Sequence, residues 1–243
     1  MIDIHTHLLP GVDDGPATID EALALARALV QTGVTHAVVT PHVYPGQWNN
    51  TKTSLQPHFE RFQAALKALS IPLSISLGGE VRLNDSVLDL LAQDELPTLG
   101  VYQGLKTLLL ELPDGGIPLG SDKLVRHLLD RGYMPVLAHP ERNKAVMEKP
   151  ERLRPFVDMG CALQLTAASV IGEFGERAHK ASLALLDLGW ATAIASDCHN
   201  LKGRSPRMDV AGEIIARTLG LAAAKRLTGE MPTSLAGLNR TSS

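Results

Sequence analysis

Short runs of apolar residues alternate with longer amphipathic segments along almost the whole chain. Short apolar runs bounded by turn residues predict buried β-strands, and amphipathic segments predict helices that bury one face. We expect seven strands, at residues 1–7, 34–40, 73–77, 107–110, 134–138, 161–165 and 191–195.

Seven helices are predicted between and after these strands, at residues 19–32, 54–69, 85–92, 121–131, 151–159, 175–188 and 206–218. The first has a capping-box pattern, with Thr18 as N-cap and Glu21 three residues later, and it stops at Gly33. A short helical turn follows the last helix. We expect the polar tail from Pro232 onward to be frayed.

The regular alternation of strand and helix predicts an α/β protein with a parallel sheet covered by helices. No linker, repeat or change of composition divides the chain, so residues 1–243 are expected to form a single domain. An open doubly wound sheet and a closed (β/α)7 barrel both fit. We favour the barrel, because chemically special residues occur at the ends of nearly all the strands, and in a barrel those ends surround one mouth.

The first strand ends in His5-Thr6-His7, and residues two apart on a strand face the same side, so the two imidazoles can share a cation. The ends of later strands also carry side chains that can bind metals. Burying so many ionisable groups without partners would be costly, so the set predicts a metal site. Its members are His5, His7, His42, Glu80, Glu111, His139, Asp197 and His199, with Asp13 or Asp14 in the first loop.

Five of the nine histidines belong to this set. The others, at positions 36, 58, 127 and 179, open a strand or lie on helices and are expected to be structural. Imidazole and carboxylate ligands together suit Mn²⁺, Fe²⁺ or Zn²⁺. One carboxylate can bridge two cations, and a multinuclear cluster suits the hydrolysis of phosphate esters.

Two arginines, Arg142 and Arg204, leave loops at the predicted mouth, three residues after His139 and five after His199. A guanidinium group matches phosphate oxygens, so both are candidates to bind a phosphoryl group. The alternative is a surface arginine paired with a neighbouring acid. Tyr44, in the polar loop at 43–51, either lines a substrate pocket or packs back on the barrel, and the same alternatives hold for Trp48 in that loop.

Cys198 and Arg204 also fit the Cys-x5-Arg-Ser pattern of phosphatases that use a cysteine thiolate. Asp197 and His199 flank this cysteine, and the metal hypothesis needs both of them. We therefore expect Cys198 to point away from the site and Cys161 to be a small core residue.

The overall composition excludes several classes of function. The net charge is −3, which gives no electrostatic reason to bind nucleic acid or an anionic membrane, and the aromatic content of 4% argues against a base-stacking surface. Neither a signal peptide nor a transmembrane segment is recognised. Two cysteines fit free thiols in a reducing compartment, so a cytoplasmic protein is expected.

Six segments resemble the polymerase and histidinol phosphatase (PHP) superfamily, and within it the bacterial manganese-dependent protein-tyrosine phosphatases of capsule and exopolysaccharide synthesis. The first is the most specific, because His-x-His followed by Gly-Val-Asp-Asp-Gly-Pro separates this branch from histidinol phosphatases. Most of the family has alanine where this chain has Cys198. The segments are residues 2–16, 40–42, 79–82, 110–113, 137–142 and 196–200.

The resemblance implies a distorted seven-stranded barrel holding three divalent metal ions, with Mn²⁺ preferred over Fe²⁺ or Zn²⁺. It implies that Arg142 and Arg204 grip the phosphoryl group, and that Asp14 rather than Asp13 is a ligand. The implied ligand sets are His5, His7, Glu80 and Asp197 for the first metal, Glu80, Glu111 and His139 for the second, and Asp14, His42 and His199 for the third.

We therefore expect a metal-dependent protein-tyrosine phosphatase that uses a metal-activated hydroxide and forms no phosphoenzyme. The resemblance implies a phosphotyrosine protein as partner, the tail of an autophosphorylating membrane kinase that regulates capsule or exopolysaccharide synthesis. Three alternatives stay open: a small-molecule phosphomonoesterase, such as one for histidinol phosphate; a thiolate phosphatase; and a non-catalytic, metal-stabilised binding module. No oligomeric state is predicted.

Overall fold

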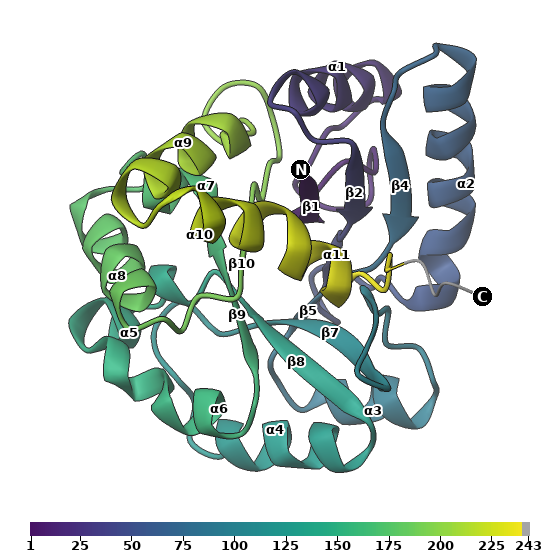
Figure 1. Cartoon of the computed structure of the whole chain (residues 1–243). Helices are drawn as coiled ribbons and strands as arrows, with labels where there is room; N and C mark the ends of the chain where they lie inside the picture. Colours follow the sequence, from purple (N-terminus) through teal and green to yellow (C-terminus); the bar gives the residue numbers. More distant parts are fainter. Residues whose placement is uncertain (240–243) are drawn as a thin grey trace.

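The structure, a computed structural model, describes residues 1–239 and contains parallel strands alternating with helices (Figure 1). Each of the seven predicted strands overlaps an observed one. The strands of the described residues are β1 (Ile2–Thr6), β2 (His36–Val39), β3 (His42–Val43), β4 (Ser74–Leu77), β5 (Glu80–Arg82), β6 (Gly100–Tyr102), β7 (Leu105–Glu111), β8 (Tyr133–Ala138), β9 (Ala162–Thr166) and β10 (Ala193–Ala195).

The helices cover the outside of the strands (Figure 1). They are α1 (Ile19–Gln31), α2 (Lys52–Ala68), α3 (Ser86–Ala92), α4 (Ser121–Asp130), α5 (Lys144–Glu148), α6 (Arg154–Asp158), α7 (Ala167–Val170), α8 (Glu176–Asp187), α9 (Met208–Thr218), α10 (Leu221–Lys225) and α11 (Met231–Leu235), with short turns η1 (Pro140–Arg142), η2 (Pro150–Leu153) and η3 (Arg226–Glu230). The capping box of α1 is formed as predicted. None of the helices within residues 1–239 combines the length and the apolar character needed to cross a bilayer.

The parallel strands form two sheets, in the orders β1-β2-β4 and β10-β9-β8-β7-β5-β3. The sheets are connected because β2 runs into β3, and β4 into β5, after two-residue breaks. On the other side, Thr6 forms a parallel bridge with Cys198, and the backbone N–H of Asp197 donates to the carbonyl of His5 at 2.8 Å. The α/β class is confirmed, and the strand order is consistent with a distorted barrel of seven strand positions.

Each break has a local cause. Pro41 has no N–H to donate and interrupts the ladder between β2 and β3. Between β4 and β5, a Cβ atom on Gly79 would lie 2.3 Å from Cγ of Pro97, so only glycine fits. The breaks let the strand restart at a new angle, directly before His42 and Glu80.

Two expectations need correction. The predicted helix at 151–159 is interrupted, because Pro155 cannot donate its N–H within a continuous helix, and the segment forms η2 and then α6. The antiparallel strand β6 was not predicted. It pairs with β7 through a turn at Gln103 and Gly104, which both have positive φ, as two-residue hairpin turns require.

The core has two parts. One lies between the strands and the surrounding helices, and the other fills the inside of the barrel with residues such as Ile4, Val38, Leu109 and Val136. Leu235, at the end of α11, is fully buried in this inner part.

The segment from Pro232 to Leu238 is therefore packed against the barrel, so the expectation of a frayed tail is wrong for these residues. The last residues of the predicted tail, 240–243, lie outside the described part. The hydroxyl of Thr107 donates to the carbonyl of Leu235 at 2.7 Å. A Cβ on Gly100 would meet the backbone of Ala236 at 2.3 Å, which shows how closely α11 approaches β6. Helix α11 closes the barrel at the end where the strands begin, because Leu235 shares a buried cluster with Met134, Ala162 and Ala193, at the starts of β8, β9 and β10.

Candidate metal centre

The two histidines that end β1 face each other. Their Nε2 atoms lie 3.2 Å apart, and both side chains are fully buried. Two nitrogen ligands at about 2.1 Å from one ion would be separated by about 3.0–3.4 Å. The pairing of β1 with β2 shifts register between Asp3 and Thr6, and such irregularities next to active sites redirect side chains.

Two buried carboxylates converge on the same point. Oε2 of Glu80 lies 3.2 Å from Nε2 of His5, 3.3 Å from Nε2 of His7 and 3.0 Å from Nδ1 of His42. Oδ1 of Asp197 lies 3.3 Å from Nε2 of His5 and 3.4 Å from Nε2 of His7. Glu80 follows the break between β4 and β5, and Asp197 follows β10, so distant strand ends supply one cluster.

The adjacent aspartates of the first loop have different positions. Asp14 Oδ1 lies 3.3 Å from Nε2 of His42 and 3.1 Å from Nε2 of His199. Asp13 instead accepts from Nδ1 of His7 at 2.7 Å and from the backbone N–H of His42 at 3.0 Å. The loop is tight: a Cβ on Gly15 would lie 2.7 Å from the carbonyl of His7. Asp14 faces the cluster, and Asp13 lies behind it.

The third group is more open. Nε2 of His139 lies 2.7 Å from Oε1 of Glu80 and 4.0 Å from Oε1 of Glu111. Oε2 of Glu111 is paired with the Arg82 guanidinium at 2.8 Å. Among the described residues, the group whose ligand atoms all lie within 4.8 Å of one another and that includes Glu111 is formed with His42 and Glu80, and His139 is not part of it.

The donor set fits divalent cations. Three groups of atoms lie close enough to hold one each: His5, His7, Glu80 and Asp197; His7, Asp14, His42 and His199; and His42, Glu80 and Glu111. Oε2 of Glu80, Oδ1 of Asp197 and Nε2 of His199 are buried, and within the described chain none has a partner with hydrogen-bond geometry, although each lies near charged groups. Buried polar atoms without such partners are costly unless an ion satisfies them.

Backbone conformation also marks this site. His139 and Asp197 have φ angles of 29° and 51°, in the left-handed region that residues with a Cβ rarely occupy. Each such residue costs about 1–3 kcal/mol, and the surrounding structure must impose it. The strain falls on two residues that turn a side chain into the mouth directly after a strand.

The charges of the site stabilise one another. Burial works to lower the pKa of His42, but Glu80 and Asp14 outweigh it and raise the pKa to about 9. Burial works to raise the pKa of Asp197, but His5 and the arginines hold it well below its ordinary value. By contrast, burial together with His7 lowers the pKa of His199 to about 4.

The two candidate arginines share one oxygen of the site. Both guanidinium groups, Arg142 from η1 and Arg204 from the loop after β10, bind Oδ2 of Asp197, the latter at 2.7 Å. The carboxylate therefore presents Oδ1 to the histidines and Oδ2 to the arginines. Arg142 also lies over the ring of Phe174, 5.1 Å from its centroid. The arginines border the metal cluster on its open side.

A cavity of about 230 Å³ opens onto this cluster. Trp48 stacks on the His42 ring with centroids 4.5 Å apart, and Arg82 lies over Tyr44 at 5.5 Å. Tyr44 and Trp48 therefore both line the cavity, which is the first of the two alternatives considered for them. The other lining residues are Asp14, Gln47, Glu111, Asp114, His139, Arg142 and Arg204.

Comparisons with known proteins agree with this architecture. A family model described as "Capsular polysaccharide synthesis, CpsB/CapC" matches residues 1–236. The chain belongs to the CpsB/CapC family. The resemblance to this branch, inferred from six short segments, is thereby confirmed across nearly the whole length.

Named relatives in the CpsB/CapC family are similar along most of the chain. Tyrosine-protein phosphatase YwqE of Bacillus subtilis (strain 168) is 34% identical over 220 residues, which cover 90% of this chain and 85% of YwqE. Tyrosine-protein phosphatase CpsB of Streptococcus pneumoniae is 30% identical over 97% of this chain and 98% of its own. A chain from the crystal structures of YwqE and CpsB, described as "unique metal-dependent tyrosine phosphatases", superposes with a TM-score of 0.89 at 32% identity, covering 98% of this chain and 95% of that one.

The cysteine alternative conflicts with the structure. The Cys198 side chain is fully buried in the outer core, and burial, with Asp3 and Asp197 nearby, raises the pKa of its thiol well above the ordinary value of a cysteine. A thiol with this pKa holds its proton near neutrality and is a poor nucleophile. Cys161 is likewise buried, as predicted, and burial raises its pKa to about 12.

Sequence reasoning missed one supporting residue, Gln164, and considered Asp13 only as a possible metal ligand. Oε1 of Gln164, on β9, lies 2.9 Å from Nδ1 of His5 and accepts from the backbone N–H of His139. Asp13 has the same relation to His7. Such partners fix which imidazole nitrogen faces a metal. A polar residue inside an apolar strand was the available signal for Gln164.

The histidines expected to be structural lie apart from the cluster. His36 pairs with the Ser76 hydroxyl at 3.0 Å across neighbouring strands, and Nδ1 of His179 lies 3.2 Å from the carbonyl of Ser169. His58 and His127 are on the exposed faces of α2 and α4.

Proposed function

We propose that this CpsB/CapC-family protein is a metal-dependent protein-tyrosine phosphatase. The observation that carries the proposal is the convergence of buried imidazoles and carboxylates beside two arginines, in a cavity that opens to solvent. The names of YwqE and CpsB support the same activity, because both are tyrosine-protein phosphatases and are similar over most of their length.

We propose three divalent cations at the site, with Mn²⁺ preferred over Fe²⁺ or Zn²⁺. Their ligands would be His5, His7, Glu80 and Asp197; Glu80, Glu111 and His139; and Asp14, His42 and His199. When bound, such cations supply a hydroxide nucleophile near neutral pH and neutralise the charge of a phosphoryl group. The buried atoms of Glu80, Asp197 and His199 that have no hydrogen-bond partner support this assignment.

The arginines would bind the substrate's phosphoryl oxygens. Arg142 and Arg204 are both paired with Asp197 and both line the cavity, which places two guanidinium groups beside it. Guanidinium groups bind phosphate oxygens in pairs, and charge that grows on those oxygens in the transition state strengthens these bonds. Trp48 and Tyr44 would form the wall against which the phenol ring lies.

The partner proposed is a phosphotyrosine protein, the tail of a bacterial tyrosine kinase that regulates capsule or exopolysaccharide synthesis. The family's link with capsular polysaccharide synthesis supports this partner. A cytoplasmic site of action is proposed with it, and two buried free thiols agree with a reducing compartment.

The test is hydrolysis of a phosphotyrosine peptide by protein stripped with chelator and then given back Mn²⁺. Activity is expected to vanish on stripping and to return with the metal, and metal analysis should count the ions bound. Histidinol phosphate, tested in parallel, separates the small-molecule alternative. Activity that survives complete removal of metal contradicts the proposal, and so does a reloaded protein that prefers the small phosphomonoester.

A further inference from the structure

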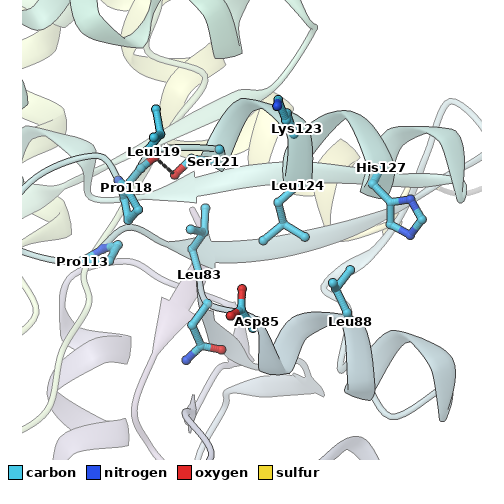
Figure 2. Close-up of a pocket in the computed structure, with 12 residues that line it drawn as sticks. Leu83, Asp85, Leu88, Pro113, Pro118, Leu119, Ser121, Lys123, Leu124 and His127 are labelled. Atoms are coloured by element: carbon cyan, nitrogen blue, oxygen red, sulfur yellow. Dashed lines mark hydrogen bonds between the residues drawn. The ribbon is translucent and has the colours of Figure 1, made fainter.

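A second depression lies beside the catalytic cavity, between α3 and α4 (Figure 2). It has a volume of about 610 Å³, larger than the catalytic cavity itself. Figure 2 shows Pro113, Pro118 and Leu119 at one end and Leu88 and His127 at the other, with Leu83 between the two helices. We call this depression the α3–α4 groove.

The α3–α4 groove and the catalytic cavity are lined by consecutive residues of the same two segments. Leu83 directly follows Arg82, and Pro113 directly precedes Asp114, and both Arg82 and Asp114 line the catalytic cavity. Glu80, which begins β5, and Glu111, which ends β7, thus lie three residues before Leu83 and two residues before Pro113 of the groove. A chain with one residue in the cavity would pass over the groove within a few residues.

The groove offers apolar surface that the described chain leaves uncovered. The side chain of Leu119 is fully exposed, and that of Leu88, on α3, is 43% exposed. Leu124 and Pro113 form partly buried walls between them. The hydroxyl of Ser121 donates to the carbonyl of Pro118 at 2.7 Å and fixes the loop that carries Leu119. Exposed apolar side chains on a fixed loop gain free energy when a partner covers them.

We propose that the α3–α4 groove binds aliphatic or aromatic residues that flank the phosphotyrosine in the substrate polypeptide. The inference rests on the proposed function, since a protein substrate must place neighbouring residues around the mouth. The catalytic cavity holds one side chain, and the groove beside it supplies an apolar site that a free phosphotyrosine does not reach. The groove then selects peptide substrates over small phosphomonoesters.

The test compares three substrates: a phosphotyrosine peptide with leucines at the flanking positions on both sides, the same peptide with serines there, and free phosphotyrosine. For the wild-type protein, KM for the leucine peptide is expected to be about five- to tenfold below that for the serine peptide, at similar kcat. The double variant Leu88→Glu/Leu119→Glu should abolish this difference and leave the hydrolysis of free phosphotyrosine unchanged. Leu221→Glu, a remote exposed leucine, is the matched control.

Equal KM values for the two peptides in the wild-type protein would overturn the proposal, and so would a difference that survives the double substitution. Fluorescence anisotropy of both peptides repeats the comparison without turnover. The groove is therefore tested even if no phosphotyrosine is hydrolysed, an outcome that would contradict the proposed function alone. A wild-type dimer that becomes monomeric in the double variant would show that a second copy of the chain occupies the groove, which also overturns the proposal.

Discussion

The two ends of the barrel contrast sharply. At the end where the strands begin, apolar side chains such as Ile4 and Val136 fill the interior, and Leu235 of α11 seals it. At the end where the strands finish, imidazoles and carboxylates occupy the mouth of the barrel, and the backbone at His139 and Asp197 is strained. The same strands therefore supply stability at one end and costly polar burial at the other.

The contrast teaches that the candidate site is supported by the rest of the molecule. Buried charges and left-handed residues each destabilise a fold, and they persist only where other interactions impose them. The sealed apolar interior below the site provides such interactions. Substitutions at the two ends should accordingly separate activity from stability.

The largest effect is expected at Glu80, whose carboxylate belongs to two of the candidate metal groups. Glu80→Gln keeps the shape but removes the charge that faces four imidazoles, and kcat/KM for a phosphotyrosine peptide should fall about a thousandfold or more. The variant should also bind less metal, with an unchanged circular dichroism spectrum. Wild-type turnover by this variant would remove Glu80 from the mechanism.

At the sealed end, Leu235→Ala should produce the reverse pattern. Truncating this fully buried side chain leaves a cavity in the barrel interior and should lower the free energy of unfolding by about 2–5 kcal/mol. Urea unfolding measures the loss. Below the melting transition, kcat should stay at the wild-type value. A large fall in kcat would show that packing at the sealed end also controls the geometry of the metal site, against the separation proposed here.

A smaller effect is expected at Asp13, which touches the site only through its neighbours. Asp13→Ala removes the acceptor behind Nδ1 of His7, so metal affinity, measured by titration, should fall about 10- to 100-fold. Asp13→Asn keeps an acceptor without the charge, and its metal affinity should lie between those of Asp13→Ala and the wild type. Asp20→Ala, on α1, serves as the control and should change nothing.

The smallest effect is expected at Cys198. Because its thiol is buried and keeps its proton, Cys198→Ser should leave kcat/KM unchanged and should lower stability by about 1 kcal/mol through the buried hydroxyl. A loss of activity comparable to that of Glu80→Gln would return the thiolate mechanism to consideration.

The same contrast explains what could be predicted from the sequence. The end of β1 was predictable, because an apolar run followed by His5 and His7 has a local signature that the strand period converts into geometry. The side chains at the other strand ends follow the same rule, and the structure brings them together. The partner of His7 was not predictable, since the choice between Asp13 and Asp14 depends on a loop held by close contact at Gly15.

The sealed end was misread for a different reason. Helix α11 is only five residues long, too short for a periodic pattern, and Leu235 owes its burial to strands far away in the sequence. The break at Pro41 and the one at Gly79 had visible signals in proline and glycine. Their consequence, a strand that restarts, depended on tertiary packing around Pro97.

The bridge between Thr6 and Cys198 has a consequence for how the molecule forms. Contacts between residues so far apart in the chain close a long loop, and they form late because closure entropy must be overcome first. During synthesis, β1 leaves the ribosome long before its partner does. His5 and His7 can therefore meet Asp197 and His199 only after nearly the whole polypeptide has been made, and we expect the ligand set to be completed late in folding.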